Sequence, residues 1–128
     1  MKVARAHHIA VICSNYERSK AFYSETLGFP IIAETYRAER QSYKLDLAVG
    51  EGFAIELFSF PNPPARPHQP EACGLRHFAF AVESVETEAR RLEELGVAVE
   101  PIRVDALTGR KYTFFADPDG LPLELYEA

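Results

Sequence analysis

The sequence predicts an α+β fold made of two tandem βαβββ modules, and the main reason is an internal repeat. Residues 8–29 (HIAVICSNYERSKAFYSETLGF) resemble residues 77–97 (HFAFAVESVETEARRLEELGV). Each segment has a histidine, an apolar strand-like run, a serine at a helix start, an amphipathic helix and a closing Leu-Gly. Residues 53–60 (FAIELFSF) likewise resemble residues 121–128 (LPLELYEA). The matches keep one order at an offset of 68 or 69 residues, which indicates a duplication.

The elements of the first module follow from its apolar spacing and its turn residues. Ser14 and Glu17 have the spacing of a capping box, and Gly28 suits the position after a helix end. The GEG at 50–52 predicts a hairpin turn between two alternating segments. The expected elements are a strand over 4–13, a helix over about 15–27, and strands over 30–37, 43–49 and 53–60.

The second module has the same pattern of elements. Ser84 is expected to cap a helix whose apolar side chains share one face. The DPDG at 117–120 is a strong turn signal before the last strand. The apolar residues on the helix face are Val85, Ala89, Leu92 and Leu95. The expected elements are a strand over 76–82, a helix over 85–95, and strands over about 97–103, 111–116 and 121–126.

A proline-rich segment, PNPPARPHQP at 61–70, separates the two modules. Proline removes a backbone donor and fixes φ, so this segment is expected to be a stiff, extended connector. A module of roughly 60 residues is marginal alone, which favours two modules that pack into one domain over 1–128. Module 1 is expected at about 1–60, the connector at 61–74 and module 2 at about 75–128.

Composition limits the classes of partner. The 128 residues include 14 basic and 19 acidic side chains, a net charge of −5, and the longest basic patch is GRK at 109–111, so nucleic acid is not an expected partner. The longest clean apolar runs have five residues and no export signal is visible, so no membrane partner is expected. Cys13 and Cys73 lack C-x-x-C spacing and are interpreted as reduced thiols of a cytoplasmic protein.

Four residues at repeated landmarks are candidate metal ligands: His8, Glu56, His77 and Glu124. Each glutamate interrupts an apolar strand, where a carboxylate without a partner is costly. Two neutral imidazoles and two carboxylates suit one divalent ion per site; Zn, Ni or Co are expected first, with Mn or Fe as alternatives. The plain alternatives are structural histidines and solvent-facing glutamates, and the recurrence in both modules favours the metal.

Strand alternation also predicts the walls of a pocket. Adjacent side chains on a strand point to opposite faces, so His8 is the expected ligand and His7 faces away, with a supporting role at most. The residues expected to line a pocket for a compact organic substrate are Ile12, Phe58, Phe60, Ala79 and Tyr126. The alternative is that these residues are ordinary core.

These features resemble the vicinal oxygen chelate superfamily and, within it, glyoxalase I. The resemblance rests on AFYSETLGF at 21–29 and on the order His, Ile-Glu-Leu, His, Asp-Pro-Asp-Gly, Leu-Glu-Leu. It implies a curved mixed sheet around a metal held by the four candidate ligands, in a homodimer. It also implies lyase or isomerase chemistry on a 2-oxoaldehyde–thiol adduct through a metal-bound enediolate, which yields a lactoyl thioester. Glu124, or else Glu56, would shuttle the proton.

Two positions depart from the glutathione-dependent pattern of that family. The family has an arginine four residues after the first histidine and an asparagine four residues after the first glutamate, where this chain has Ile12 and Phe60. Natural partners for the carboxylates of glutathione are therefore missing, and metal-dependent lyase or isomerase chemistry is expected without a commitment to glutathione. The alternatives within the superfamily are a dioxygenase, a thiol transferase and a non-enzymatic, drug-binding dimer.

Overall fold

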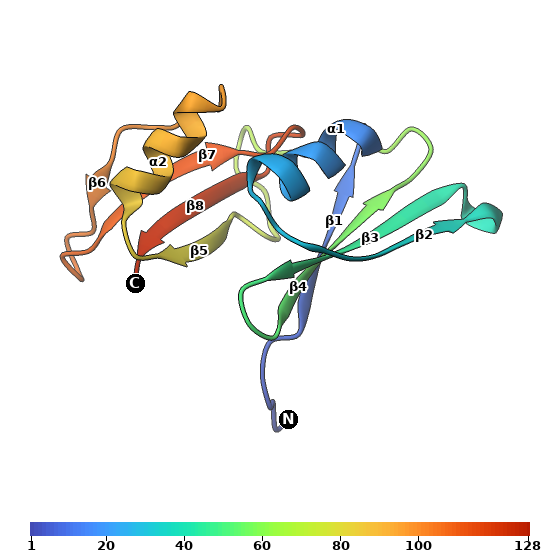
Figure 1. The fold of residues 1–128 in the computed structure, drawn as a ribbon, viewed down its shortest axis with the longest axis horizontal. Helices are drawn as coiled ribbons and strands as arrows, with labels where there is room; N and C mark the ends of the chain where they lie inside the picture. The colour runs from blue at the N-terminus through green and yellow to red at the C-terminus, as the bar shows by residue number, and fades with distance from the viewer. The chain divides into compact units, whose positions relative to one another are not determined.

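The structure, a computed structural model that describes residues 1–128, has two units, Met1–Ala65 and Arg66–Ala128 (Figure 1). The boundary falls within the proline-rich segment 61–70. Each unit has one four-stranded mixed sheet, and its elements follow the order strand, helix, three strands. The expected α+β class and the two βαβββ modules are therefore confirmed.

Unit 1 is built on a sheet with strand order β1-β4-β3-β2. Strand β1 runs parallel to β4, and the other neighbours are antiparallel. The hairpin between β3 and β4 turns at GEG, where Gly50 and Gly52 have φ of +58° and +74°, so the expected turn is present. The elements are β1 His8–Cys13, α1 Tyr16–Ala21, a π-helix Phe22–Thr26, β2 Ile31–Arg37, a 3₁₀ turn Ala38–Arg40, β3 Ser42–Val49 and β4 Phe53–Ser59.

The sheet of unit 1 has one apolar face and one polar face. Alternation puts Leu45, Ile55 and Leu57 on one face, where each is at most 1% exposed. The helical segments supply Tyr16 and Tyr23 to the same core, and α1 contacts β4. The opposite face carries the histidine and glutamate of the repeat, so packing of the core determines where these polar side chains lie.

Unit 2 repeats this arrangement with strand order β5-β8-β7-β6, in which β5 is parallel to β8. Helix α2 contacts β7 and β8 and buries Val85, Ala89 and Leu92 of its predicted apolar stripe. The fourth residue of the stripe, Leu95, follows the helix and is 54% exposed. Ser84 caps this helix, because its side chain accepts a hydrogen bond from the Thr87 amide at 3.2 Å. The elements are β5 Phe78–Val82, α2 Val85–Glu94, β6 Arg103–Val104, β7 Lys111–Ala116 and β8 Pro122–Glu127.

Three element boundaries differ from the sequence prediction. The first strand begins at His8 rather than at residue 4. The helix expected over 15–27 is a short α-helix that continues as a π-helix, Phe22–Thr26. The strand expected over 97–103 is wrong, since only Arg103–Val104 pairs with β7. The Glu100 amide still donates a 2.9 Å hydrogen bond to the Phe114 carbonyl of β7, but Pro101 has no amide hydrogen and interrupts the ladder.

The cap of the first helix also differs from the prediction. Ser14 is not the N-cap; the N-cap is Asn15, whose Oδ1 accepts a hydrogen bond from the Arg18 amide at 3.1 Å. Asparagine and serine cap helices about equally well, so propensity alone does not choose between two neighbours. The backbone decides, because Asn15 has the extended φ and ψ of a cap, −128° and 103°.

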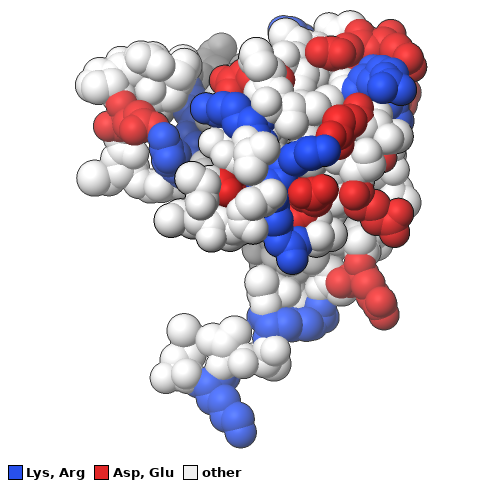
Figure 2. All heavy atoms as spheres, turned by 90° about the vertical axis from the view of Figure 1, so that its left-hand side faces the viewer, with Lys and Arg blue, Asp and Glu red and all other residues white.

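The surface charge, the helices and the two cysteines bear on which partners the chain can have. Figure 2 looks onto the side where β6 and α2 lie in Figure 1, and it shows Lys and Arg interspersed with Asp and Glu, without a broad block of one sign. None of the helices combines the length and the apolar character that crossing a membrane requires. Neither Cys13, which is buried, nor Cys73, which is exposed, is in a disulfide.

We expect Asn15→Ala to lower the free energy of unfolding by about 0.5–2 kcal/mol, because the first turn of α1 loses its acceptor. Ser14→Ala is the matched control, and its loss should be smaller. Urea denaturation of both variants, followed by far-UV circular dichroism, makes the comparison. A larger loss at Ser14 would contradict the cap seen in the structure.

Glu34 on β2 joins the strand to helix α1. Its Oε2 accepts hydrogen bonds from Lys20 Nζ, at 2.7 Å, and from the Tyr16 hydroxyl. The Lys20 hydrogen bond, with the Tyr16 hydrogen bond second, lowers the pKa of Glu34 below its usual range. A carboxyl with a lowered pKa in the folded state stabilises the fold above its unfolded pKa, and this contribution disappears as the pH falls through the folded pKa.

We therefore expect Glu34→Gln to be less stable than the parent at neutral pH, by no more than about 1 kcal/mol because the pair is partly exposed. The difference should shrink as the pH falls below about 4.3, the ordinary glutamate value, and vanish below the folded pKa. Denaturation at a series of pH values measures it. Glu93→Gln, on the exposed side of α2, is the control; a Glu34 difference that grows in acid would refute this assignment.

Candidate functional site

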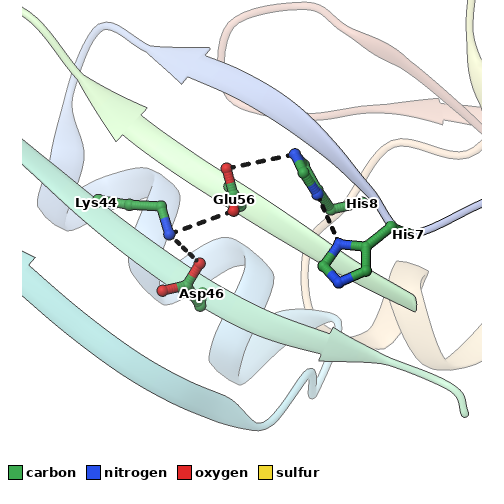
Figure 3. A network of polar contacts seen from close by, with 5 residues as sticks. All are labelled: His7, His8, Lys44, Asp46 and Glu56. Atoms are coloured by element: carbon green, nitrogen blue, oxygen red, sulfur yellow. Dashed lines mark hydrogen bonds and ion pairs between the residues drawn. The ribbon is translucent and has the colours of Figure 1, made fainter. Parts of the chain in front are cut away.

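In unit 1 the structure brings His8 and Glu56 together. Strands β1 and β4 are parallel neighbours, and their register pairs His8 with Ala54 and Ala10 with Glu56. Since alternate residues share a face, the histidine and the glutamate project from the same side of the sheet. His8 Nε2 lies 3.6 Å from Glu56 Oε2 (Figure 3). One imidazole nitrogen and one carboxylate oxygen are thus adjacent on the face opposite the core.

Unit 2 builds the same pair from the same register. Strand β5 is parallel to β8 and pairs Ala79 with Glu124, as Ala10 pairs with Glu56 in unit 1. His77, one residue before β5, places its Nε2 3.1 Å from Glu124 Oε2. Glu124 is buried, with 8% of its surface exposed. The repeat seen in the sequence therefore corresponds to a repeat of geometry.

Two charged residues of unit 1 that sequence reasoning did not place at the site lie beside Glu56. Lys44 Nζ is 3.2 Å from Glu56 Oε1 and donates a 2.7 Å hydrogen bond to Asp46 Oδ1 (Figure 3). Strand β3 places both, because Asp46 is opposite Glu56 in the antiparallel ladder. The hydrogen bond to Asp46 raises the pKa of Lys44, burial opposes the shift, and Glu56 adds to it. The two oxygens of Glu56 thus have separate neighbours, Lys44 and His8.

Unit 2 has aromatic residues where unit 1 has this charged pair. Phe114 on β7 lies opposite Glu124, which is the position of Asp46 relative to Glu56. The ring of His77 contacts Phe114 edge-on, with centroids 5.2 Å apart. Glu124 is therefore in a more apolar environment than Glu56. The two halves share the His–Glu pair and differ in what surrounds it.

His7 makes a contact that its position on the strand did not predict. Its Nδ1 lies 2.8 Å from His8 Nδ1, and the two rings meet edge-on (Figure 3). One of these nitrogens must donate a proton and the other must accept it. The contact restricts the ring of His8 while its Nε2 stays directed toward Glu56. Alternation of side chains does not reveal such a contact, because His7 precedes the strand.

The predicted pocket residues lie in several surroundings. Phe58 and Phe60 stack with centroids 6.1 Å apart, and Arg37 lies over both rings. Ile12, on the same side of β1 as His8, is 55% exposed. The hydroxyl of Tyr126 is engaged in hydrogen bonds with Thr108 Oγ1, at 2.6 Å, and Asp105 Oδ2, at 3.0 Å. Ala79 lies directly beside Glu124 in the ladder.

Unit 2 contains a cavity of about 600 Å³ that includes His77 in its lining. Its walls come from segments 66–77 and 98–103, from β7 and from the start of β8. Ala79 and Tyr126 are not among its lining residues, whereas Phe114 and Pro122 are. The described walls place a partly open cavity next to the histidine of the second pair. This size is typical of sites for small organic molecules.

The donor chemistry of the two pairs fits a divalent metal. Imidazole nitrogen and carboxylate oxygen together suit first-row ions such as zinc, nickel or cobalt. The structure has no cluster of three or more His, Cys, Asp or Glu side chains able to hold such an ion, so each unit supplies only two donors. In unit 1 the Lys44 ammonium occupies Oε1 of Glu56, which leaves Oε2 and His8 Nε2 as the donor atoms.

Comparison with known proteins agrees with this geometry. YwkD of Bacillus subtilis, named as uncharacterized, is 60% identical over 99% of both chains. Glyoxylase I 4 of Arabidopsis thaliana is 32% identical, over 93% of this chain and 68% of that protein. The crystal structure of a glyoxalase family protein from Enterococcus faecalis has a TM-score of 0.90 at 51% identity and covers 97% of this chain and 98% of that one. The family model matches residues 5–125, and the chain therefore belongs to the glyoxalase/bleomycin resistance protein/dioxygenase superfamily.

Proposed function

We propose that the protein is a metal-dependent lyase or isomerase of the glyoxalase I type, which acts on the adduct of a small 2-oxoaldehyde and a thiol. The observation that carries the proposal is the pair of equivalent His–Glu contacts, His8 with Glu56 and His77 with Glu124. Members of the superfamily commonly use a divalent metal and are typically dimers that bind small molecules. The name of the Arabidopsis relative, Glyoxylase I 4, supports the reaction class.

The two pairs would hold one divalent ion through four donors. These are the Nε2 atoms of His8 and His77 and carboxylate oxygens of Glu56 and Glu124, taken from one chain or from two copies of it. Zinc, nickel or cobalt suit the set best, with manganese or iron as alternatives. When bound, the ion polarises the oxygens of the substrate and stabilises negative charge that develops on them. Lys44 keeps one oxygen of Glu56 occupied by a cation and so orients the other.

Glu124 is the better proton carrier of the two glutamates, with Glu56 as the alternative. Glu124 is opposite Phe114, a lining residue of the cavity, in the β7–β8 ladder, whereas Glu56 is paired with Lys44. Lys44 holds one oxygen of Glu56, whereas no lysine or arginine pairs with Glu124, so Glu124 is better placed to carry the proton. The carboxylate would remove the proton from the carbon that bears sulfur and hydroxyl and return it to the neighbouring carbonyl carbon, while the hydroxyl proton of the first carbon passes to the carbonyl oxygen of the second. The product is a 2-hydroxy thioester, and no other reactant is consumed.

The thiol need not be glutathione. Ile12 and Phe60 occupy the positions where glutathione-dependent members have arginine and asparagine. Both side chains are apolar, and Ile12 is exposed. The nearby cation Arg37 lies over the rings of Phe58 and Phe60, which compete for its charge. The proposal therefore names a small thiol adduct as substrate, processed by a cytoplasmic homodimer in detoxification of 2-oxoaldehydes such as methylglyoxal.

The first test measures metal content and thioester formation together. We expect about one divalent ion per four-ligand set in the purified protein, and thioester formation from methylglyoxal with at least one of several thiols. Chelation should abolish the reaction and metal should restore it. Absence of metal under conditions of ready supply would refute the proposal. Metal without thioester formation would refute the substrate and favour another reaction of the superfamily, a dioxygenase or a thiol transferase.

The ligand assignment is tested by Glu56→Ala against the control Glu51→Ala. We expect Glu56→Ala to lose metal and keep its fold, because one donor is removed while the apolar core on the other face stays intact. Glu51 lies exposed in the β3–β4 turn, so its variant should bind metal normally. Elemental analysis and circular dichroism give the two readouts. Full metal content in Glu56→Ala would refute that ligand.

His7 provides a further test of the same site. If His8 Nε2 binds the metal, the proton of His8 is on Nδ1 and His7 Nδ1 accepts it. We expect His7→Ala to weaken metal binding by about 10- to 100-fold. His7→Asn, whose amide oxygen can take the place of Nδ1, should recover part of the loss. Competition with a coloured chelator measures both constants, and equal affinity for the Ala variant and the parent would disprove this role.

A further inference from the structure

Beside the His–Glu pair, the cavity of unit 2 has a lining with more cationic than anionic side chains. Three arginines, two histidines and two glutamates line its volume of about 600 Å³, and all belong to residues Arg66–Ala128. His77, which contacts Glu124, is one of the histidines. A molecule that occupies the cavity therefore reaches one of the proposed metal ligands and also meets the arginines.

Two of the three arginines are neutralised within the cavity. Arg76 Nε lies 2.7 Å from Glu71 Oε1, and Arg103 Nη2 lies 2.9 Å from Glu100 Oε2. The Arg103 guanidinium also lies over the rings of Tyr112 and Phe114. Aromatic faces and carboxylates both compensate positive charge, so neither arginine leaves a strong demand for an external anion.

Arg66 is different, because only neutral groups contact it. Its Nη2 donates hydrogen bonds to the carbonyl oxygens of Leu75, at 2.7 Å, and Arg76, at 3.2 Å. Its Nε is buried and has no hydrogen-bond partner. Arg37 in unit 1 also has a buried Nε without a partner, but its guanidinium lies over two phenylalanine rings. Arg66 thus carries the positive charge of the cavity that no carboxylate or ring offsets.

The two carbonyl contacts also fix where this charge lies. Leu75 and Arg76 directly precede His77, so Arg66 is tied to the backbone that carries the proposed ligand. A guanidinium held in place loses little entropy on binding, and its geometry suits carboxylate and phosphate oxygens. Phe114 and Pro122 supply apolar wall to the same cavity. The cavity therefore suits a compact molecule with an anionic end and an uncharged middle.

We propose that Arg66 binds an anionic group of the substrate, a carboxylate or a phosphate, in the cavity of unit 2, and so selects acidic thiol adducts. The identity of the adduct rests on the proposed function. The anion site itself depends only on the charged residues that line the cavity of unit 2. The proposed anion contact is then made by a residue of the connector, and not at positions 12 and 60 of unit 1.

The test measures anion binding to the full-length, chelator-treated protein, so neither metal nor turnover enters. Three probes are compared: 3-mercaptopropionate for the carboxylate, inorganic phosphate for the phosphate, and 2-mercaptoethanol as the neutral thiol. We expect one or both anions to shift the backbone amide resonances of residues 66–77 and 98–103, with an affinity that falls as salt is added. The neutral thiol should bind at least about tenfold more weakly than the anion that binds.

Variants separate the charge of Arg66 from its structural contacts. Arg66→Gln keeps a donor for the carbonyls and removes the charge, whereas Arg66→Lys keeps the charge. We expect about a tenfold or greater loss of anion binding for Gln and a smaller loss for Lys. Arg90→Gln, exposed on α2 outside the cavity, is the control and should bind as the parent does. The amide spectrum of each variant reports whether the fold is kept.

The outcomes are distinct from those of the proposed function. Binding by either anion that depends on Arg66 supports the site and identifies carboxylate or phosphate as the group. Equal binding of the neutral thiol, anion shifts confined to residues that do not line the cavity, or undiminished binding by Arg66→Gln would overturn it. Failure to form a thioester would refute the proposed reaction and leave the anion result intact. If thioester forms, Arg66→Gln should also erase the preference in kcat/KM for adducts of 3-mercaptopropionate over those of 2-mercaptoethanol.

Discussion

Glu56 and Glu124 each carry a carboxylate on the central part of a sheet, and the loss of water there must be compensated. In both units the compensation begins with a histidine from the neighbouring parallel strand, at 3.6 Å in unit 1 and 3.1 Å in unit 2. Parallel pairing is what makes this possible, because a histidine at the strand start and a glutamate two positions along the register share one face. The helix on the opposite face secures that orientation, since turning the strand over would bury the carboxylate among leucines.

The surroundings of the two carboxylates differ. In unit 1 a complete ion-pair network, Lys44 with Asp46 and Glu56, keeps a cation next to the glutamate at all times. In unit 2 the equivalent ladder position is Phe114, so the carboxylate of Glu124 has an apolar neighbour. Glu56 therefore has an ammonium beside it, and Glu124 has an aromatic ring across the ladder. A duplicated scaffold can thus supply two chemically unequal carboxylates by changing two positions on one strand.

Much of the architecture was predictable because its signals are local or periodic. The repeat, the α2 stripe, the Ser84 cap and the GEG and DPDG turns all depend on residues close in the chain. Asp117 illustrates this, since its Oδ1 accepts from the Asp119 and Leu121 amides within one turn. The predictions that were wrong involved a choice between near-equal residues, as at Ser14 and Asn15, or a strand with too few partners, as at 97–103.

The site was predictable only in part, for a physical reason. Recurrence identified the histidines and glutamates, and in the structure each histidine contacts the glutamate of its own unit. Metal binding by these residues stays a prediction. Lys44 and Asp46 carried no comparable signal, because their importance depends on the β3–β4 register and their equivalents in unit 2 are Tyr112 and Phe114. Arg66 was one of several scattered cations in the sequence. Only the three-dimensional structure shows that the others near it are neutralised while Arg66 is held by two carbonyls beside His77.

The distribution of positive charge separates the proposed anion site from the His–Glu pairs. In unit 1, the guanidinium groups of Arg37 and Arg40 lie over the ring of Phe60, so their positive charges are partly compensated by an aromatic face. In unit 2, the connector brings Arg66 to the backbone just before His77. A connector tolerates substitution more readily than a strand that carries a ligand, because its side chains do not hold a sheet together. If Arg66 binds the anion as proposed, recognition by residues 66–77 can change without disturbing the His–Glu pairs, because Arg66 contacts the backbone before His77 and neither of the two pairs.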